Sequence, residues 1–119
     1  MGQRIAALMG SGLSALSAEA ISGFESENLT ATGTVQGDAL RLAADHNYVT
    51  TVASGTGVIL PSTGWNKGDM ITIMNLGANT LKVYPQTGSA IGAAAADASV
   101  NVTAGSKVNY YYISATQWI

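Results

Sequence analysis

The sequence predicts an all-β domain, a small antiparallel β-sandwich or barrel, with an N-terminal arm that is extended or partly helical. Three observations predict it: short alternating polar and apolar runs from Asn28 onward, turn-forming residues between those runs, and a different composition before them. The 119 residues correspond to one domain by size. We therefore divide the chain into an arm, residues 1–27, and a β-domain, residues 28–119.

The arm is rich in Ala, Ser and Gly, and its apolar residues recur at irregular intervals. This spacing fits a helical stripe only loosely, and Gly10 and Gly12 weaken a helix. Arg4 ahead of an apolar stretch gives a weak likeness to a secretory signal. We interpret the arm instead as a segment that becomes ordered on docking to a partner. Four apolar residues are expected to contact that partner: Ile5, Leu8, Leu13 and Leu16.

Eight strands are expected in the β-domain, separated by Gly, Asn, Asp and Pro. They are residues 29–34, 39–43, 47–53, 57–60, 70–75, 80–84, 99–103 and 107–114. The clearest expected hairpin joins 70–75 to 80–84 through Gly77-Ala78-Asn79. Residues 88–98 are expected to form a loop or one helical turn. A repeat of 20–50 residues is not visible, which argues against a solenoid.

Composition excludes several classes of partner. Only 10% of the residues are charged and the net charge is −2, so the chain lacks the basic stripe of an electrostatic nucleic-acid binder. The absence of cysteine excludes disulfides and thiolate metal sites. No apolar run approaches the ~18 residues of a membrane span. We expect neither nucleic acid nor membrane as a partner.

Candidate catalytic and metal-binding groups are sparse. His46 is the only histidine and falls in an expected turn, where a solvated surface role is commoner than catalysis. A Ca²⁺ site from Asp38 and Asp45 is conceivable, but turn aspartates usually bind their own backbone. A glycan hydrolase would need two carboxylates at a fixed separation in a cleft, drawn from Asp38, Asp45, Asp69 and Asp97. We expect no enzyme activity, no metal and no cofactor.

Aromatic residues near the C-terminal end indicate an interface. In a strand, Tyr110 and Tyr112 face one side and Tyr111 the other. Tyrosines of this kind pack in a core or at a subunit interface; a glycan-binding face is the rival interpretation. Trp118 and Ile119 suggest a terminal strand held in a sheet or by another subunit. The residues expected at a subunit interface are Tyr110, Tyr112, Trp118 and Ile119.

The low surface charge indicates assembly. A chain of this size leaves about a third of its unfolded surface exposed, and here Thr, Ser, Ala, Gly and Asn would cover it. Strand edges of a small β-domain also favour pairing. We expect a homo-oligomer, with a trimer as the first choice.

Three blocks carry a resemblance to a known family: GTGVILP at 55–61, GANTLKVYP at 77–85 and ISATQW at 113–118. Through them, residues 28–119 resemble small tailed-bacteriophage virion proteins, namely capsid decoration (cement) proteins and head-fibre modules. The resemblance implies a β-rich structural protein without catalysis on the capsid exterior, bound to the major capsid protein. The alternative is a head- or tail-fibre module that binds a host-surface glycan.

Overall fold

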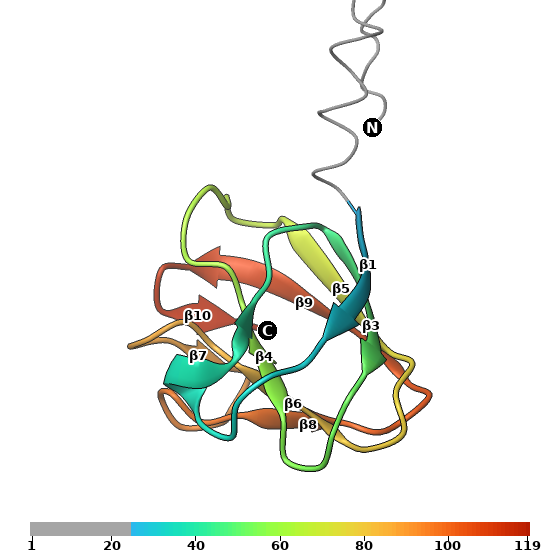
Figure 1. Cartoon of the computed structure of the whole chain (residues 1–119). Helices are drawn as coiled ribbons and strands as arrows, with labels where there is room; N and C mark the ends of the chain where they lie inside the picture. Colours follow the sequence, from blue (N-terminus) through green and yellow to red (C-terminus); the bar gives the residue numbers. More distant parts are fainter. Residues whose placement is uncertain (1–24) are drawn as a thin grey trace, which may run out of the picture.

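The computed structural model describes residues 25–119, which fold as a β-solenoid of about four turns. Two sheets make up the solenoid. In Figure 1 one sheet contains β1, β3, β5 and β9, and the other contains β4, β6 and β8. The strands are β1 (Glu25–Thr30), β2 (Leu40–Arg41), β3 (His46–Thr51), β4 (Gly57–Ile59), β5 (Met70–Asn75), β6 (Leu81–Tyr84), β7 (Ala90–Ile91), β8 (Val100–Val102), β9 (Lys107–Ser114) and β10 (Gln117–Trp118), with the short 3-10 helix η1 (Gln36–Asp38) before β2.

The chain winds because successive strands enter opposite sheets. One sheet has the order β1-β3-β5-β9-β10-β7 and the other β2-β4-β6-β8. The ladders β1/β3, β3/β5, β2/β4 and β4/β6 are parallel, as expected when each turn stacks on the one before. Only the last turn is reversed, since β8 runs antiparallel to β6 and β9 runs antiparallel to β5.

The predicted antiparallel β-sandwich or barrel is therefore wrong, although the all-β class is correct. The expected hairpin of 70–75 with 80–84 does not form. Strand β5 pairs with β3 and β9, whereas β6 pairs with β4 and β8 in the other sheet. Alternation and a Gly/Asn turn are common to a hairpin and a solenoid corner, so these local signals do not identify the pairing partner.

The argument against a solenoid also fails, for a physical reason. Glu25 pairs with His46, 21 residues later, and His46 pairs with Thr72, 26 residues later. In the other sheet, Leu40 pairs with Val58, 18 residues later. Turns of unequal length stack their strands without giving the sequence a fixed period.

Most expected strands lie close to the observed ones. Strand β1 starts at Glu25, four residues before the expected strand and inside the segment assigned to the arm. Residues 88–98 contain the two-residue strand β7 rather than a helical turn. No α-helix occurs in the 95 residues from 25 to 119, and no helix there is long and apolar enough to cross a membrane.

The core fills the space between the two sheets. Its largest member, Trp118, is fully buried. Apolar side chains of both sheets contribute to the same cluster, among them Val49, Ile71, Ile73 and Tyr110 from one sheet and Val58, Leu81, Val83 and Val102 from the other. Hydrophobic burial therefore holds the stacked turns together across the molecule.

Two asparagines, Asn75, which is buried, and Asn79, which is exposed, fix the corner after β5. The Nδ2 of Asn75 donates to the carbonyl oxygens of Asn79 and Val102, each at 2.9 Å, and its Oδ1 accepts the Gly77 N–H at 3.0 Å. Asn79 Nδ2 donates to the carbonyl of Val52 in the preceding turn at 2.9 Å. A Cβ at Gly77 would lie 2.7 Å from Val52 Cγ2, so the corner requires glycine. These contacts connect three successive turns.

Candidate functional site

An exposed apolar row crosses the outer face of the six-stranded sheet. Met70 on β5 is the register partner of Tyr111 on β9. The N–H groups of Tyr111 and Ile119 donate to each other's carbonyl oxygens at 2.6 and 2.9 Å, which places Ile119 beside Tyr111. The side chains of Met70, Tyr111 and Ile119 are 36%, 45% and 56% exposed. We call these three residues the apolar row.

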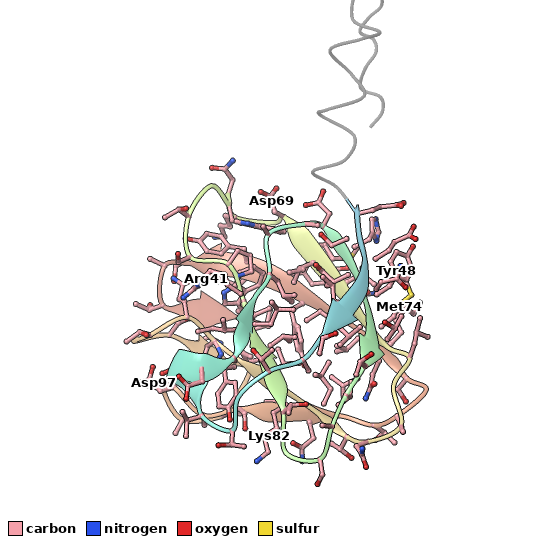
Figure 2. All side chains as sticks on the ribbon, in the orientation of Figure 1. Arg41, Tyr48, Asp69, Met74, Lys82 and Asp97 are labelled. Carbon is pink, nitrogen blue, oxygen red and sulfur yellow. The ribbon has the colours of Figure 1, made fainter. Side chains whose placement is uncertain are left out.

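A second pair of large side chains lies on the same face. Tyr48 on β3 is the register partner of Met74 on β5, and Figure 2 shows the two side chains next to each other at the edge of the view. Both are partly buried. Met74 also pairs with Lys107 on β9, which is exposed. This end of the face therefore combines apolar contact area with a positive charge.

Polar residues separate the apolar row from Tyr48 and Met74. Thr72 Oγ1 hydrogen-bonds to Asn109 Oδ1 at 2.9 Å, and His46 is the β3 partner of Thr72. These three residues occupy the middle register of the outer face. The face therefore carries large apolar side chains at both ends, with Lys107 at one of them, and hydrogen-bonding groups at its centre, a composition suited to protein contact.

Three of the four residues predicted at a subunit interface contribute to the chain's own packing. Trp118 is fully buried, Tyr110 is 8% exposed and Tyr112 is partly buried against the core cluster. Burial raises the pKa of the Tyr110 hydroxyl. Ile119 is exposed, in the apolar row. The expected alternation of the three tyrosines is confirmed, with Tyr111 on the outer face.

Trp118 is the centre of an aromatic cluster beside β9. Its ring centroid lies 5.5 Å from that of Trp65 and 5.2 Å from that of Tyr112, the latter with the rings edge to face. The indole N–H is buried and has no hydrogen-bond partner among residues 25–119. Apolar burial must outweigh that desolvation cost of about 1–3 kcal/mol, so the cluster is structural.

Met70 was not among the residues predicted from the sequence. Its position in the row depends on the β5/β9 register, which joins residues about 40 apart. The signal available in the sequence was the alternation that places Tyr111 on the opposite side from Tyr110 and Tyr112. The arm residues Ile5, Leu8, Leu13 and Leu16 lie outside the described residues.

Two of the carboxylates, those of Asp97 and Asp69, accept hydrogen bonds within loops. Asp97 accepts the Gly88 N–H at 2.7 Å and Gln36 Nε2 at 3.1 Å, and these bonds lower the pKa of its carboxyl. Asp69 Oδ2 accepts the Asn66 N–H at 2.8 Å. Within residues 25–119, no group of three or more His, Asp or Glu side chains is placed to hold a metal ion.

No protein-family model matches this chain, and no curated protein or solved structure is significantly similar to it. The function is therefore argued from the surface described above and from the resemblance in the sequence.

Proposed function

We propose that this protein is a structural component of a tailed-phage virion, which decorates the exterior of the capsid and stabilises it by bridging neighbouring capsid subunits. In this proposal it acts as a homo-oligomer, with a trimer as the expected form. The observation that carries the proposal is the apolar row of Met70, Tyr111 and Ile119, which is exposed although the chain buries a large apolar core of its own.

Contact through the apolar row would stabilise an assembly without charge pairing. Fully burying a side chain of this size contributes about 1.5–3 kcal/mol, and many copies on one particle add to the total. Only 10% of the residues of the chain are charged, and the three side chains of the row carry no charge, so little desolvation of charge opposes the contact. We expect binding that depends weakly on salt concentration.

The arm provides the second contact in this proposal. Its apolar residues lie in a segment of low charge that immediately precedes β1. In this proposal the apolar row and the apolar residues of the arm each contact a different capsid subunit. That is the minimum a bridging protein requires.

The test uses purified capsids of the phage that carries this protein, stripped of it and then incubated with variants. Tyr111→Glu places a charge in the apolar row, and deletion of residues 1–23 removes most of the arm. Asn101→Glu is the matched control, because Asn101 is exposed on the other sheet. We expect each of the first two changes to reduce occupancy at least about tenfold, which corresponds to 1.4 kcal/mol. Undiminished occupancy with both would overturn the proposal.

A fibre module that binds a host glycan is the second candidate, and Trp65 favours it. This side chain is partly exposed on the loop between β4 and β5, and aromatic rings stack on sugars. Binding of the isolated protein to a glycan array, lost in Trp65→Ala and kept in Tyr111→Glu, would support this candidate. Tyr110 is unsuitable for the test because its substitution would disturb the core. Trp65 contacts the ring of Trp118, so the Trp65→Ala result counts only if this variant keeps the circular dichroism spectrum of the wild type.

A further inference from the structure

A second row of side chains crosses the outer face of the six-stranded sheet. Tyr48 on β3 pairs with Met74 on β5, which pairs with Lys107 on β9. The residues that alternate with them, among them Val49 and Ile73, are fully buried in the core, so the row points outward. Figure 2 shows Tyr48 and Met74 at the edge of the molecule. Together with Glu27 on β1, these residues form what we call the mixed row: Glu27, Tyr48, Met74 and Lys107.

Glu27 is the β1 end of the mixed row. The β1/β3 ladder is paired at Ser26 and again at Leu29, with an irregularity between them, and the partners in those two pairs are the residues on either side of Tyr48. Glu27 therefore lies beside Tyr48. It is exposed, whereas Ser26 and Leu29 are partly buried. From β1 to β9 the row is acidic, aromatic, apolar and basic.

The charges of these four strands lie on opposite sides of the face. Strand β1 carries Glu25 and Glu27, and β9 carries Lys107, all of them exposed. Strands β3 and β5, which lie between, contain no Asp, Glu, Lys or Arg. A face with an acidic side, a basic side and large uncharged side chains in the middle is complementary to a second copy of itself.

We propose that the mixed row is a contact between two copies of this chain, related by a two-fold axis that runs along the strands between β3 and β5. Such an axis lays β1 of one copy over β9 of the other, and β3 over β5. Glu27 then faces Lys107 of the second copy, and Tyr48 faces Met74. Each of these contacts occurs twice in the pair. Packed sheets lie about 10 Å apart, a distance that side chains of this length span from both sides.

Charge selects this arrangement over other contacts. Pairing the free edge of β1 with β1 of another copy would place Glu25 and Glu27 against the same residues, and like charges opposite each other are unfavourable. A partner of uniform charge would match only one side of the face. In the two-fold pair the burial of Tyr48 and Met74 supplies most of the stabilisation, and the ion pairs fix the orientation.

The contact leaves the apolar row free for the proposed function. Strands β1 and β3 begin at Glu25 and His46, which share a register level with Thr72, whereas Met70 lies two residues before Thr72. An axis along the strands keeps each level opposite itself, so these strands of the second copy do not extend over Met70 and Tyr111. The two-fold contact is also distinct from the contact that the expected trimer requires, and symmetric assemblies can combine both kinds. The inference does not rest on the virion role.

Charge-reversal variants of the full chain, studied without capsids, test the contact. Glu27→Lys makes lysines face each other in the pair, and Lys107→Glu makes glutamates do so. We expect each change to raise the Kd of self-association at least about tenfold, measured by sedimentation equilibrium. Lys82→Glu is the matched control, because it makes the same substitution on β6 of the other sheet, and it should leave the Kd unchanged. Circular dichroism checks that each variant keeps the wild-type fold.

An equimolar mixture of Glu27→Lys and Lys107→Glu distinguishes a two-fold contact from other modes of association. In a mixed pair both ionic contacts again join a lysine to a glutamate. We therefore expect the mixture to associate as tightly as the wild type, in complexes with an even number of chains, although neither variant does so alone. A ring of three cannot satisfy all its contacts with two kinds of chain.

Three outcomes would overturn the inference: a wild type that stays monomeric, a mixture that stays dissociated or forms complexes with an odd number of chains, and an equal loss of association in Lys82→Glu. Capsid occupancy of Tyr111→Glu tests the proposed function separately, so the failure of one proposal is distinguishable from the failure of the other.

Discussion

The two ends of the solenoid are built differently. At the C-terminal end the chain reverses, so that β8 and β9 run antiparallel to β6 and β5, and Trp118 of β10 is fully buried in the core. At the N-terminal end β1 and β2 are edges, and Leu29 and Leu40 are only partly buried. Both ends leave sheet edges, since β7 and β8 also pair on one side only. The comparison teaches that the reversed end buries a large aromatic ring of its own, whereas the first turn covers the core only with partly buried leucines.

The largest expected effect comes from breaking the reversed end. Trp118→Ala removes a fully buried ring that contacts Trp65 and Tyr112, and we expect the free energy of unfolding to fall by about 3–5 kcal/mol. Urea denaturation followed by circular dichroism measures this. Tyr111→Ala on the outer face is the matched control and should change stability by less than about 1 kcal/mol. Similar losses for the two would show that Trp118 is not part of the core.

The corner that holds the reversal should respond next. Asn75→Ala leaves the Gly77 N–H and the carbonyls of Asn79 and Val102 without their buried partner. We expect a loss of about 2–3 kcal/mol, since unpaired buried polar groups are costly. Asn101→Ala, at an exposed position, should cost no more than about 0.5 kcal/mol. A loss as small for Asn75 as for Asn101 would contradict the role given to this corner.

The first turn should be more tolerant of substitution. In the chain without residues 1–23, Leu29→Ala should cost about 1 kcal/mol, because its side chain is partly exposed. Val49→Ala, at the fully buried partner position, should cost about 2 kcal/mol. Equal costs in the shortened chain would show that Leu29 is covered as fully as Val49.

The smallest expected effect is electrostatic. The Gly88 N–H and Gln36 Nε2 lower the pKa of the Asp97 carboxyl below 3.8, so the fold favours its ionised form. The resulting stability is complete above the unfolded pKa and is lost as the pH falls through the lower folded pKa. We therefore expect the melting temperature of the wild type to fall slightly more steeply at acidic pH than that of Asp97→Asn, measured by thermal unfolding at a series of pH values. Asn tolerates the positive φ of 66° at this position, and parallel curves would contradict the prediction.

The strands could be predicted from the sequence because their signals are local. Alternation in 70–75 and 107–114 located β5 and β9 at their observed bounds, and it gave the opposite orientations of Tyr110 and Tyr111. The pairing could not be predicted in the same way. Gly77 and Asn79 are as typical of a hairpin turn as of the corner they form, and only their contacts with Val52 show that the chain continues into another sheet.

The candidate site was predictable in part for the same reason. Alternation separated Tyr111 from Tyr110 and Tyr112, but the interface was predicted at Tyr110 and Tyr112, whereas the structure exposes Tyr111. Ile119 was among the predicted contact residues. Met70 joins them only through the β5/β9 register. The aromatic content near the C-terminal end indicated an interface, but most of it closes the core instead, since Trp118 and Tyr110 are buried within the chain.

The central claim is that the chain coils, with β3 and β5 parallel in one sheet and β6 in the other. Nuclear Overhauser contacts between backbone protons of the isotope-labelled full chain test this most directly. The account predicts parallel-strand contacts that link His46 with Thr72 and Tyr48 with Met74, and antiparallel contacts between Ile71 and Tyr110. Antiparallel contacts between residues 70–75 and 80–84, the pattern of a hairpin, would contradict it.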